Sequence, residues 1–281
     1  MPGHRTRIEV EGRDAAFVDC GPAGGVPVVL LHGAGFDHAR LTWRLATRDL
    51  ARDRRVIVPD LPGYGATDAI AGPHDLERLG RWLVAFLDRL GLGQVDMAGL
   101  SMGGGMALWL ALERHERIRR LVPVAAYGLM GRLPFHPLAH AAAGLGAMGA
   151  AYGASRRSAL ATRLGLAASF AVPNRVTLRT VAEVMDVARD QSNRRSFDAF
   201  LAAELGTWAL RSDLSGRLPE IGRRTLVIHG RSDRIVPVRY ARRAARLIPH
   251  AEYLELPTGH WPMRELPDRF NAALRGFLDA S

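Results

Sequence analysis

Apolar and polar positions divide the first part of the chain into strand-like and helical runs. Residues 6–11 and 14–20 alternate between the two classes on either side of Gly12-Arg13, which predicts a β-hairpin. Short, mainly apolar runs are typical of strands buried on both faces, and they occur at 26–31, 55–59, 94–98 and 118–126. Helices are predicted between these strands, at 38–50, 75–90 and 106–112.

The alternation of strands and helices stops after Tyr127 and resumes at Arg224. Between them, no segment has the pattern of a strand, and helices are predicted near 138–150, 155–170, 174–189 and 196–212. The last part of the chain is expected to contain strands at 224–229 and 252–256 and helices at 238–248 and 266–278. We therefore predict an α/β protein whose mostly parallel sheet has helices on both faces. Its core would comprise residues 1–127 and 218–281, and residues 128–217 would form a helical insertion.

The overall composition is that of an ordinary globular protein. Of the 281 residues, 48% are hydrophobic and 23% are charged, and no apolar run is long enough to cross a bilayer. The N-terminal residues lack the apolar centre of a signal segment. We expect a cytoplasmic protein without a membrane partner. Cys20 is the single cysteine, so no intramolecular disulfide can form, and it is expected to be a small buried side chain.

The formal net charge of +10 raises the question of nucleic-acid binding. All 38 basic residues are arginine, and they are spread through every predicted helix rather than gathered in one arm. Clusters such as Arg52-Asp-Arg-Arg55 and Arg239-Tyr-Ala-Arg-Arg243 have the pattern of solvated helix faces. We therefore expect a small-molecule substrate and no nucleic-acid partner.

A candidate catalytic motif, Gly99-Leu-Ser-Met-Gly103, lies between a predicted strand and a predicted helix. This spacing matches G-x-S-x-G, the nucleophile elbow, in which a serine stands on a sharp turn at the end of a strand. Glycines on either side leave room for the strained backbone. A helix that begins just after Ser101 would direct its free N–H groups towards the reacting centre. Ser101 is thus the predicted nucleophile.

A serine hydroxyl needs a base, and the base needs a carboxylate. His260, in the loop after the last predicted strand, is the candidate base, and Asp233, after the preceding strand, is the candidate carboxylate. Both loops lie at the carboxyl edge of a parallel sheet, as Ser101 does. Asp213 is the alternative acid, whereas His229 is interpreted as structural.

The oxyanion formed by attack on a carbonyl needs N–H donors. One is expected from Met102, directly after the nucleophile, and the other from the loop His32-Gly-Ala-Gly35. Ala34 is the favoured donor in that loop and Gly35 the alternative. His32 is expected to fix the loop by hydrogen bonds rather than to take part in chemistry.

These motifs, taken together, resemble the α/β-hydrolase superfamily over nearly the whole chain. The matching segments are His32-Gly-Ala-Gly, Asp60-Leu-Pro-Gly-Tyr-Gly, Gly99-Leu-Ser-Met-Gly-Gly, His229-Gly-Arg-Ser-Asp-Arg-Ile-Val-Pro and Gly259-His260. The resemblance implies an eight-stranded sheet with a helical cap after the sixth strand, which would be the insertion at 128–217. It also suggests apolar side chains that could contact the substrate, namely Phe36, Tyr127, Phe135, Tyr152, Trp208 and Trp261. No metal or organic cofactor is expected.

Within the superfamily the chain is similar to cap-bearing carboxylesterases, so the first hypothesis is a serine hydrolase of small, fairly apolar esters. Gly259-His-Trp261 and the Ser101 elbow are also similar to C–C bond hydrolases that cleave meta-ring-fission products. That family usually has Asn before the nucleophile and Pro-Gly after the loop glycines, where this chain has Leu100 and Phe36-Asp37. Further hypotheses are a biosynthetic lyase or cyclase that uses the same site and a non-catalytic ligand-binding protein. A homodimer is one hypothesis for the assembly.

Overall fold

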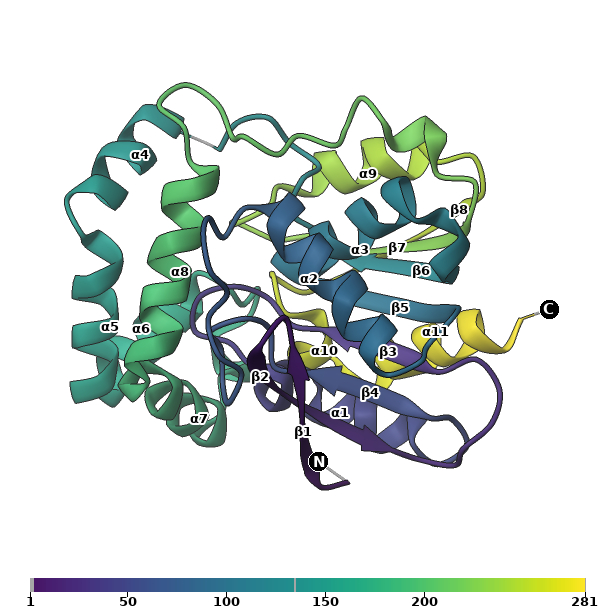
Figure 1. The fold of residues 1–281 in the computed structure, drawn as a ribbon. Coiled ribbons are helices and arrows are strands. Elements are labelled where there is room, and N and C mark those ends of the chain that lie inside the picture. The colour runs from purple at the N-terminus through teal and green to yellow at the C-terminus, as the bar shows by residue number, and fades with distance from the viewer. Residues whose placement is uncertain (1–2, 134, 281) are drawn as a thin grey trace.

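The computed structural model describes residues 3–133 and 135–280, and the strands in these ranges form one eight-stranded sheet (Figure 1). The strand order is β1-β2-β4-β3-β5-β6-β7-β8. The pairs β1–β2 and β2–β4 are antiparallel and the others are parallel, which confirms the predicted mostly parallel sheet. The strands are β1 (Arg5–Val10), β2 (Arg13–Cys20), β3 (Val28–Leu31), β4 (Val56–Pro59), β5 (Val95–Leu100), β6 (Ile118–Val124), β7 (Arg224–Gly230) and β8 (Ala251–Leu256). Cys20 is half-buried rather than buried.

Helices cover both faces of the sheet. Successive side chains of a strand point to opposite faces, so one strand contributes to two buried clusters. Val29 and Leu31 of β3 belong to one buried cluster, whereas Val28 and Leu30 belong to another. The first cluster includes α2 (Leu76–Arg89), α3 (Met102–Glu113) and α9 (Val238–Leu247). The second includes α1 (Ala39–Leu50), α10 (Pro262–Glu265) and α11 (Pro267–Asp279). The central strands β3, β4 and β5 are therefore buried on both sides, whereas the edge strand β8 is partly exposed.

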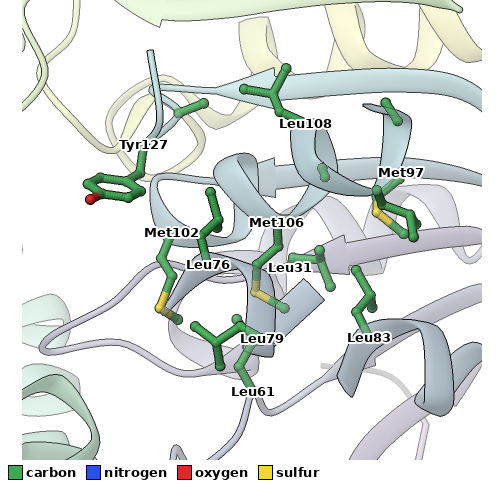
Figure 2. Close-up of a cluster of buried hydrophobic side chains, with 14 of the residues drawn as sticks. Leu31, Leu61, Leu76, Leu79, Leu83, Met97, Met102, Met106, Leu108 and Tyr127 are labelled. Carbon is green, nitrogen blue, oxygen red and sulfur yellow. The ribbon is translucent and has the colours of Figure 1, made fainter. Parts of the chain in front are cut away.

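The packing of α2 against α3 holds the turn at Ser101 in place. Leu76 and Leu79 of α2 lie beside Met102 and Met106 of α3, and all four side chains are almost fully buried (Figure 2). Met102 is the residue directly after Ser101, so its side chain anchors the first turn of α3 in the core. Full burial of such a side chain stabilises the fold by about 1.5–3 kcal/mol.

The described residues between β6 and β7 form five α-helices, which lie beyond one edge of the core in Figure 1. They are α4 (His136–Gly144), α5 (Ala147–Arg157), α6 (Ala159–Ala167), α7 (Leu178–Arg189) and α8 (Gln191–Glu204). The predicted helix at 138–150 is wrong as one element, because Gly146 adopts a left-handed conformation (φ 75°) between α4 and α5. The predicted helix at 155–170 also begins too early, since Ser158 caps a new helix by accepting from Ala161 N–H.

The predicted helix at 196–212 is wrong in its second half, because α8 ends at Glu204. The chain then turns back, and the Glu204 carboxylate accepts hydrogen bonds from the Ser212 N–H and hydroxyl, 3.0 and 2.7 Å away. The same carboxylate accepts from Leu76 N–H at 2.7 Å and from the Tyr127 hydroxyl at 2.8 Å. The hydrogen bonds from Leu76 and Tyr127 therefore fix the end of α8 to the core, and the two from Ser212 fix the segment that follows α8.

Candidate active site

Ser101 occupies a strained position between β5 and α3. Its backbone angles are φ 51° and ψ −115°, a conformation that costs a residue with a side chain roughly 1–3 kcal/mol. Two hydrogen bonds hold it there: Ser101 N–H donates to Val124 O, and Tyr127 N–H donates to Ser101 O, both at 2.9 Å. Strain that the surrounding core maintains is typical of functional positions.

Gly99 and Gly103 are required because neither position has space for a Cβ atom. A Cβ on Gly99 would lie 2.2 Å from Gly103 O, and a Cβ on Gly103 would lie 2.5 Å from His32 O. Real Cβ atoms do not approach backbone oxygens so closely. The sequence-based expectation of room on both sides of Ser101 is therefore confirmed.

The loop after β3 packs directly against Ser101. A Cβ on Gly33 would lie 3.4 Å from Ser101 Cβ, and Gly103 N–H donates to His32 O at 3.2 Å. The His32 ring accepts from Leu61 N–H at Nε2 (2.9 Å), and its Nδ1 lies 2.7 Å from Gly33 O. Burial lowers the pKa of His32 to about 3, so the ring is neutral at pH 7. The prediction that His32 fixes this loop is confirmed.

Asp37 closes the same loop and was not recognised as important from the sequence. Its buried carboxylate accepts from Gly33 N–H and His38 N–H at 2.8 Å and from the Thr42 hydroxyl at 2.6 Å. Burial raises the pKa of Asp37 to about 7 despite these donors. Ala34 and Gly35, the predicted oxyanion donors, lie inside the loop that this carboxylate closes. In the sequence, a signal for this role was that Asp37 stands five residues before Thr42, whose hydroxyl it binds.

Asp233 and His260 meet after β7 and β8. His260 Nδ1 lies 2.8 Å from Asp233 Oδ2, and both side chains are buried. The other Asp233 oxygen accepts from Ile235 N–H and Val236 N–H at 2.8 and 2.9 Å. His229 Nε2 lies 3.2 Å from Asp233 Oδ2 and 2.8 Å from Val236 O, so this histidine helps to hold the acid.

The environment of Asp233 favours its ionised form. Burial alone would raise the pKa, but the charge of His260 and hydrogen bonds from His229 and His260 hold the pKa of Asp233 well below its usual range. Asp213, the alternative acid, accepts from Ser215 N–H at 3.0 Å and borders a surface hollow with Trp109 and Arg217. Of the two candidate acids, Asp233 is the one that hydrogen-bonds His260.

The His260 loop is tied to the helical insertion. His260 N–H donates to Ser169 O at 2.7 Å. The buried Glu265 carboxylate accepts from Gly259 N–H and, at 3.1 Å, from Ala171 N–H. Burial raises the pKa of Glu265 above its usual value. Sequence reasoning missed Glu265, whose position five residues after His260 gave no distinctive signal.

The insertion also contacts the loop after β3. The rings of Phe36 and Tyr152 stack with centroids 4.0 Å apart. The Tyr152 hydroxyl donates to Asn193 Oδ1 at 2.6 Å, and the Asn193 amide donates to Asp37 O at 2.8 Å. Phe197 of α8 lies over Gly35, where an added Cβ would be 3.4 Å from the ring. The sequence marked Phe197 only as an apolar side chain of the insertion and did not single out Asn193, because only the docking of α8 brings them to the loop.

Four of the six predicted substrate-contact residues lie in aromatic pairs, and the other two are exposed. Phe36, Tyr127, Tyr152 and Trp261 lie in aromatic pairs near the loops described above. Phe135 and Trp208 are instead 83% and 70% exposed. The structure does not bring these two rings into the aromatic group, because Phe135 stands before α4 and Trp208 follows the end of α8.

Within the described residues, no group of His, Cys, Asp and Glu side chains is arranged to hold a metal ion. In the same ranges, no helix has the length and apolarity that crossing a membrane requires.

Comparison with known proteins supports the same fold. The family model described as "alpha/beta hydrolase fold" matches residues 26–265. This chain belongs to the α/β-hydrolase family. It is 31% identical to a 2-hydroxymuconate semialdehyde hydrolase of Pseudomonas putida, over 98% of this chain and 91% of that protein. This α/β hydrolase also resembles two solved structures.

The first is a meta-cleavage product hydrolase from Pseudomonas fluorescens IP01, in a mutant form complexed with acetates. Its TM-score is 0.82 at 26% identity, with 98% of this chain and 97% of that chain covered. The second is a thermophilic esterase from Thermogutta terrifontis, with malate bound, at a TM-score of 0.78, 25% identity and 98% coverage of both chains. The relatives thus include a hydrolase named for meta-cleavage products and an esterase.

Proposed function

We propose that this protein is a serine hydrolase that cleaves the C–C bond beside a ketone in a ring-fission product of the 2-hydroxy-6-oxo-dienoate type. The observation that carries the proposal is the Asp233–His260 pair, 2.8 Å apart, on the same sheet edge as the strained Ser101. The curated relative named as a 2-hydroxymuconate semialdehyde hydrolase supports the choice of bond. This choice replaces the ester as the first hypothesis.

In the proposed reaction, Ser101 Oγ attacks the ketone carbon while His260 takes the hydroxyl proton. Asp233 keeps the imidazole oriented and stabilises its charged form. The N–H groups of Met102 and Ala34, with Gly35 as the alternative, bind the oxyanion. When the C–C bond breaks, its electron pair moves to the leaving carbon, which the His260 proton then neutralises. Water, deprotonated by His260, hydrolyses the acyl ester of Ser101 and releases the acid.

We also propose that residues 128–217 act as a cap over this site, separate from a core of residues 1–127 and 218–281. The support comes from contacts on two sides of Ser101. Asn193 and Phe197 touch the loop after β3, and Ser169 accepts from His260 N–H. Phe36, Tyr152 and Trp261 would then face the acyl part of the substrate.

Ester hydrolysis is the second candidate, and a specific feature favours it. Leu100 precedes the nucleophile and Phe36-Asp37 follows the loop glycines, where C–C hydrolases usually have Asn and Pro-Gly. The buried Asp37 carboxylate, when ionised, would repel the carboxylate of a dienoate substrate at short range.

The test compares synthetic 2-hydroxy-6-oxo-dienoates with p-nitrophenyl esters, using the native protein and Ser101→Ala in ¹⁸O-labelled water. The proposal expects loss of the dienoate absorbance, one ¹⁸O in the acid product and no turnover by Ser101→Ala. Faster turnover of the esters would favour the second candidate. A rearranged product without label would indicate a lyase or cyclase, and no organophosphonate adduct on Ser101 would contradict a serine hydrolase.

A further inference from the structure

The outer surface of helices α4, α5 and α6 has an unusual composition. Every exposed residue between Phe135 and Ala168 is Phe, Leu, Pro, Ala, Gly or Arg. Leu138 and Leu145 are 69% and 88% exposed, and Leu160 and Leu164 are 68% and 66% exposed. Large apolar side chains exposed together on neighbouring helices often mark an interaction site.

The exposed leucines are aligned along their helices. Leu138 and Leu145 are seven residues apart, two turns along one face of α4 and its C-terminal end. Leu160 and Leu164 are four residues apart on one face of α6. In Figure 1, α4 and α5 lie on the outer side of α8, away from the sheet, so these two helices are separate from the contacts that α8 makes with the loop after β3.

The loop after α8 carries an exposed aromatic side chain and runs beside α4. His136 Nε2 lies 2.8 Å from Gly206 O, and His140 Nδ1 lies 3.0 Å from Leu205 O, so the loop after α8 runs beside α4. That loop carries Trp208, which is 70% exposed. Phe135, 83% exposed, precedes α4. Exposed Trp and Phe beside leucines are typical of side chains that enter the interface of a bilayer.

Charge distinguishes between the partners that could cover this surface. The chain has no Asp or Glu from Arg117 to Ala182. The exposed charged residues of α5 and α6 are Arg156, Arg157 and Arg163, and none has an acidic partner within ion-pair distance among the described residues. A second copy meeting the same face by two-fold symmetry would bring arginine towards arginine. An anionic surface would instead neutralise all three.

We propose that the outer surface of α4–α6, with Phe135 and Trp208, binds reversibly to membranes that contain anionic lipid. The leucines and aromatic rings enter the interface, and Arg156, Arg157 and Arg163 contact the headgroups. This binding would hold the helical insertion at the membrane surface. It revises the expectation of no membrane partner, which rested on the lack of a spanning segment and of an apolar signal segment.

Vesicle sedimentation tests the proposal. The probes are vesicles of phosphatidylcholine alone and vesicles with 30% phosphatidylglycerol, at low and at physiological salt. The full chain should bind the anionic vesicles at least tenfold more tightly, and more weakly as salt rises. Leu138→Glu/Leu145→Glu should lower the affinity at least tenfold. Removal of all three arginines by Arg156→Gln/Arg157→Gln/Arg163→Gln should lower it by roughly a hundredfold, at about fivefold for each arginine.

The matched control is Arg239→Gln/Arg243→Gln/Arg246→Gln, which removes the same charge from the exposed face of α9, on the core. Its affinity should stay within twofold of the native value. An equal loss in the control would show that only the net charge of +10 attracts the vesicles, and would overturn the proposal. No binding to anionic vesicles would also overturn it. Self-association that Leu138→Glu/Leu145→Glu abolishes, without vesicle binding, would assign the surface to a second copy.

Discussion

The side-chain amide of Asn193 donates to the backbone carbonyl of Asp37 across 2.8 Å, joining α8 to the loop after β3. The two residues are far apart in the chain, and each is fixed from a second direction. Asn193 accepts from the Tyr152 hydroxyl, and the Asp37 carboxylate accepts from Gly33 N–H. A displacement of α8 would therefore shift the loop in which the proposed oxyanion donor Ala34 lies.

This link predicts that Asn193→Ala lowers kcat by about tenfold and leaves KM nearly unchanged, because an oxyanion donor acts mainly on the transition state. Steady-state kinetics and the rate of organophosphonate labelling at Ser101 provide the measurement. Asn174→Ala, at an exposed position of the short 3-10 helix Pro173–Arg175, is the control and should be neutral. A rise in KM alone would show that Asn193 shapes the substrate pocket instead.

The two candidate acids can be separated by a pair of matched substitutions. Asp233→Asn keeps the size of the side chain but removes the charge that orients His260, so kcat should fall by about three to four orders of magnitude. Asp213→Asn should change kcat less than twofold. Both variants are to be assayed on the same substrate as the native protein. A large loss in Asp213→Asn with an active Asp233→Asn would reverse the assignment of the acid.

The neutral, buried His32 predicts a particular dependence of stability on pH. Its folded pKa of about 3 lies below the ordinary value of 6.5, so the unfolded chain binds more protons between these values. The free energy of unfolding should therefore fall as pH drops below 6.5, by up to about 1.4 kcal/mol per pH unit, and level off near pH 3. Above pH 6.5 this contribution is fully present.

Urea unfolding at pH 7.5 and pH 5 measures this effect, since His32→Gln should be less stable at pH 7.5 and should lose less on acidification. His115→Gln, at a side chain that is 70% exposed, is the control and should keep the native slope. If the free energy of unfolding depended on pH equally in the native protein and in His32→Gln, the assignment of a neutral His32 ring would be contradicted.

The close approach at Gly103 predicts a large effect of one methyl group. Gly103→Ala would place a Cβ 2.5 Å from His32 O, and backbone atoms must shift to relieve this contact. We expect a loss of at least about 2 kcal/mol in the free energy of unfolding, together with a loss of Ser101 labelling. Gly222→Ala, where an added Cβ meets nothing within 4 Å, should be neutral or slightly stabilising. Equal midpoints of urea unfolding for Gly103→Ala and Gly222→Ala would contradict the tight packing around Ser101.

The pattern of apolar runs determined the strands, the helices of the core and the position of the insertion, because buried strands and amphipathic helices leave a local signature. The motif around Ser101 also leaves a local signature, because Gly99 and Gly103 are required within five residues where no Cβ atom fits. The Asp233–His260 pair was predictable because neighbouring parallel strands end at one edge of the sheet.

Only the tertiary structure decided how distant polar groups pair. The carboxylates of Asp37, Glu204 and Glu265 became recognisable as buried acceptors once the segments that supply their donors were packed together. The same holds for the surface of α4–α6. A leucine at helical spacing has the same sequence pattern whether it faces the core or the solvent, so Leu138 and Leu164 were found exposed only when the partners of each helix were known.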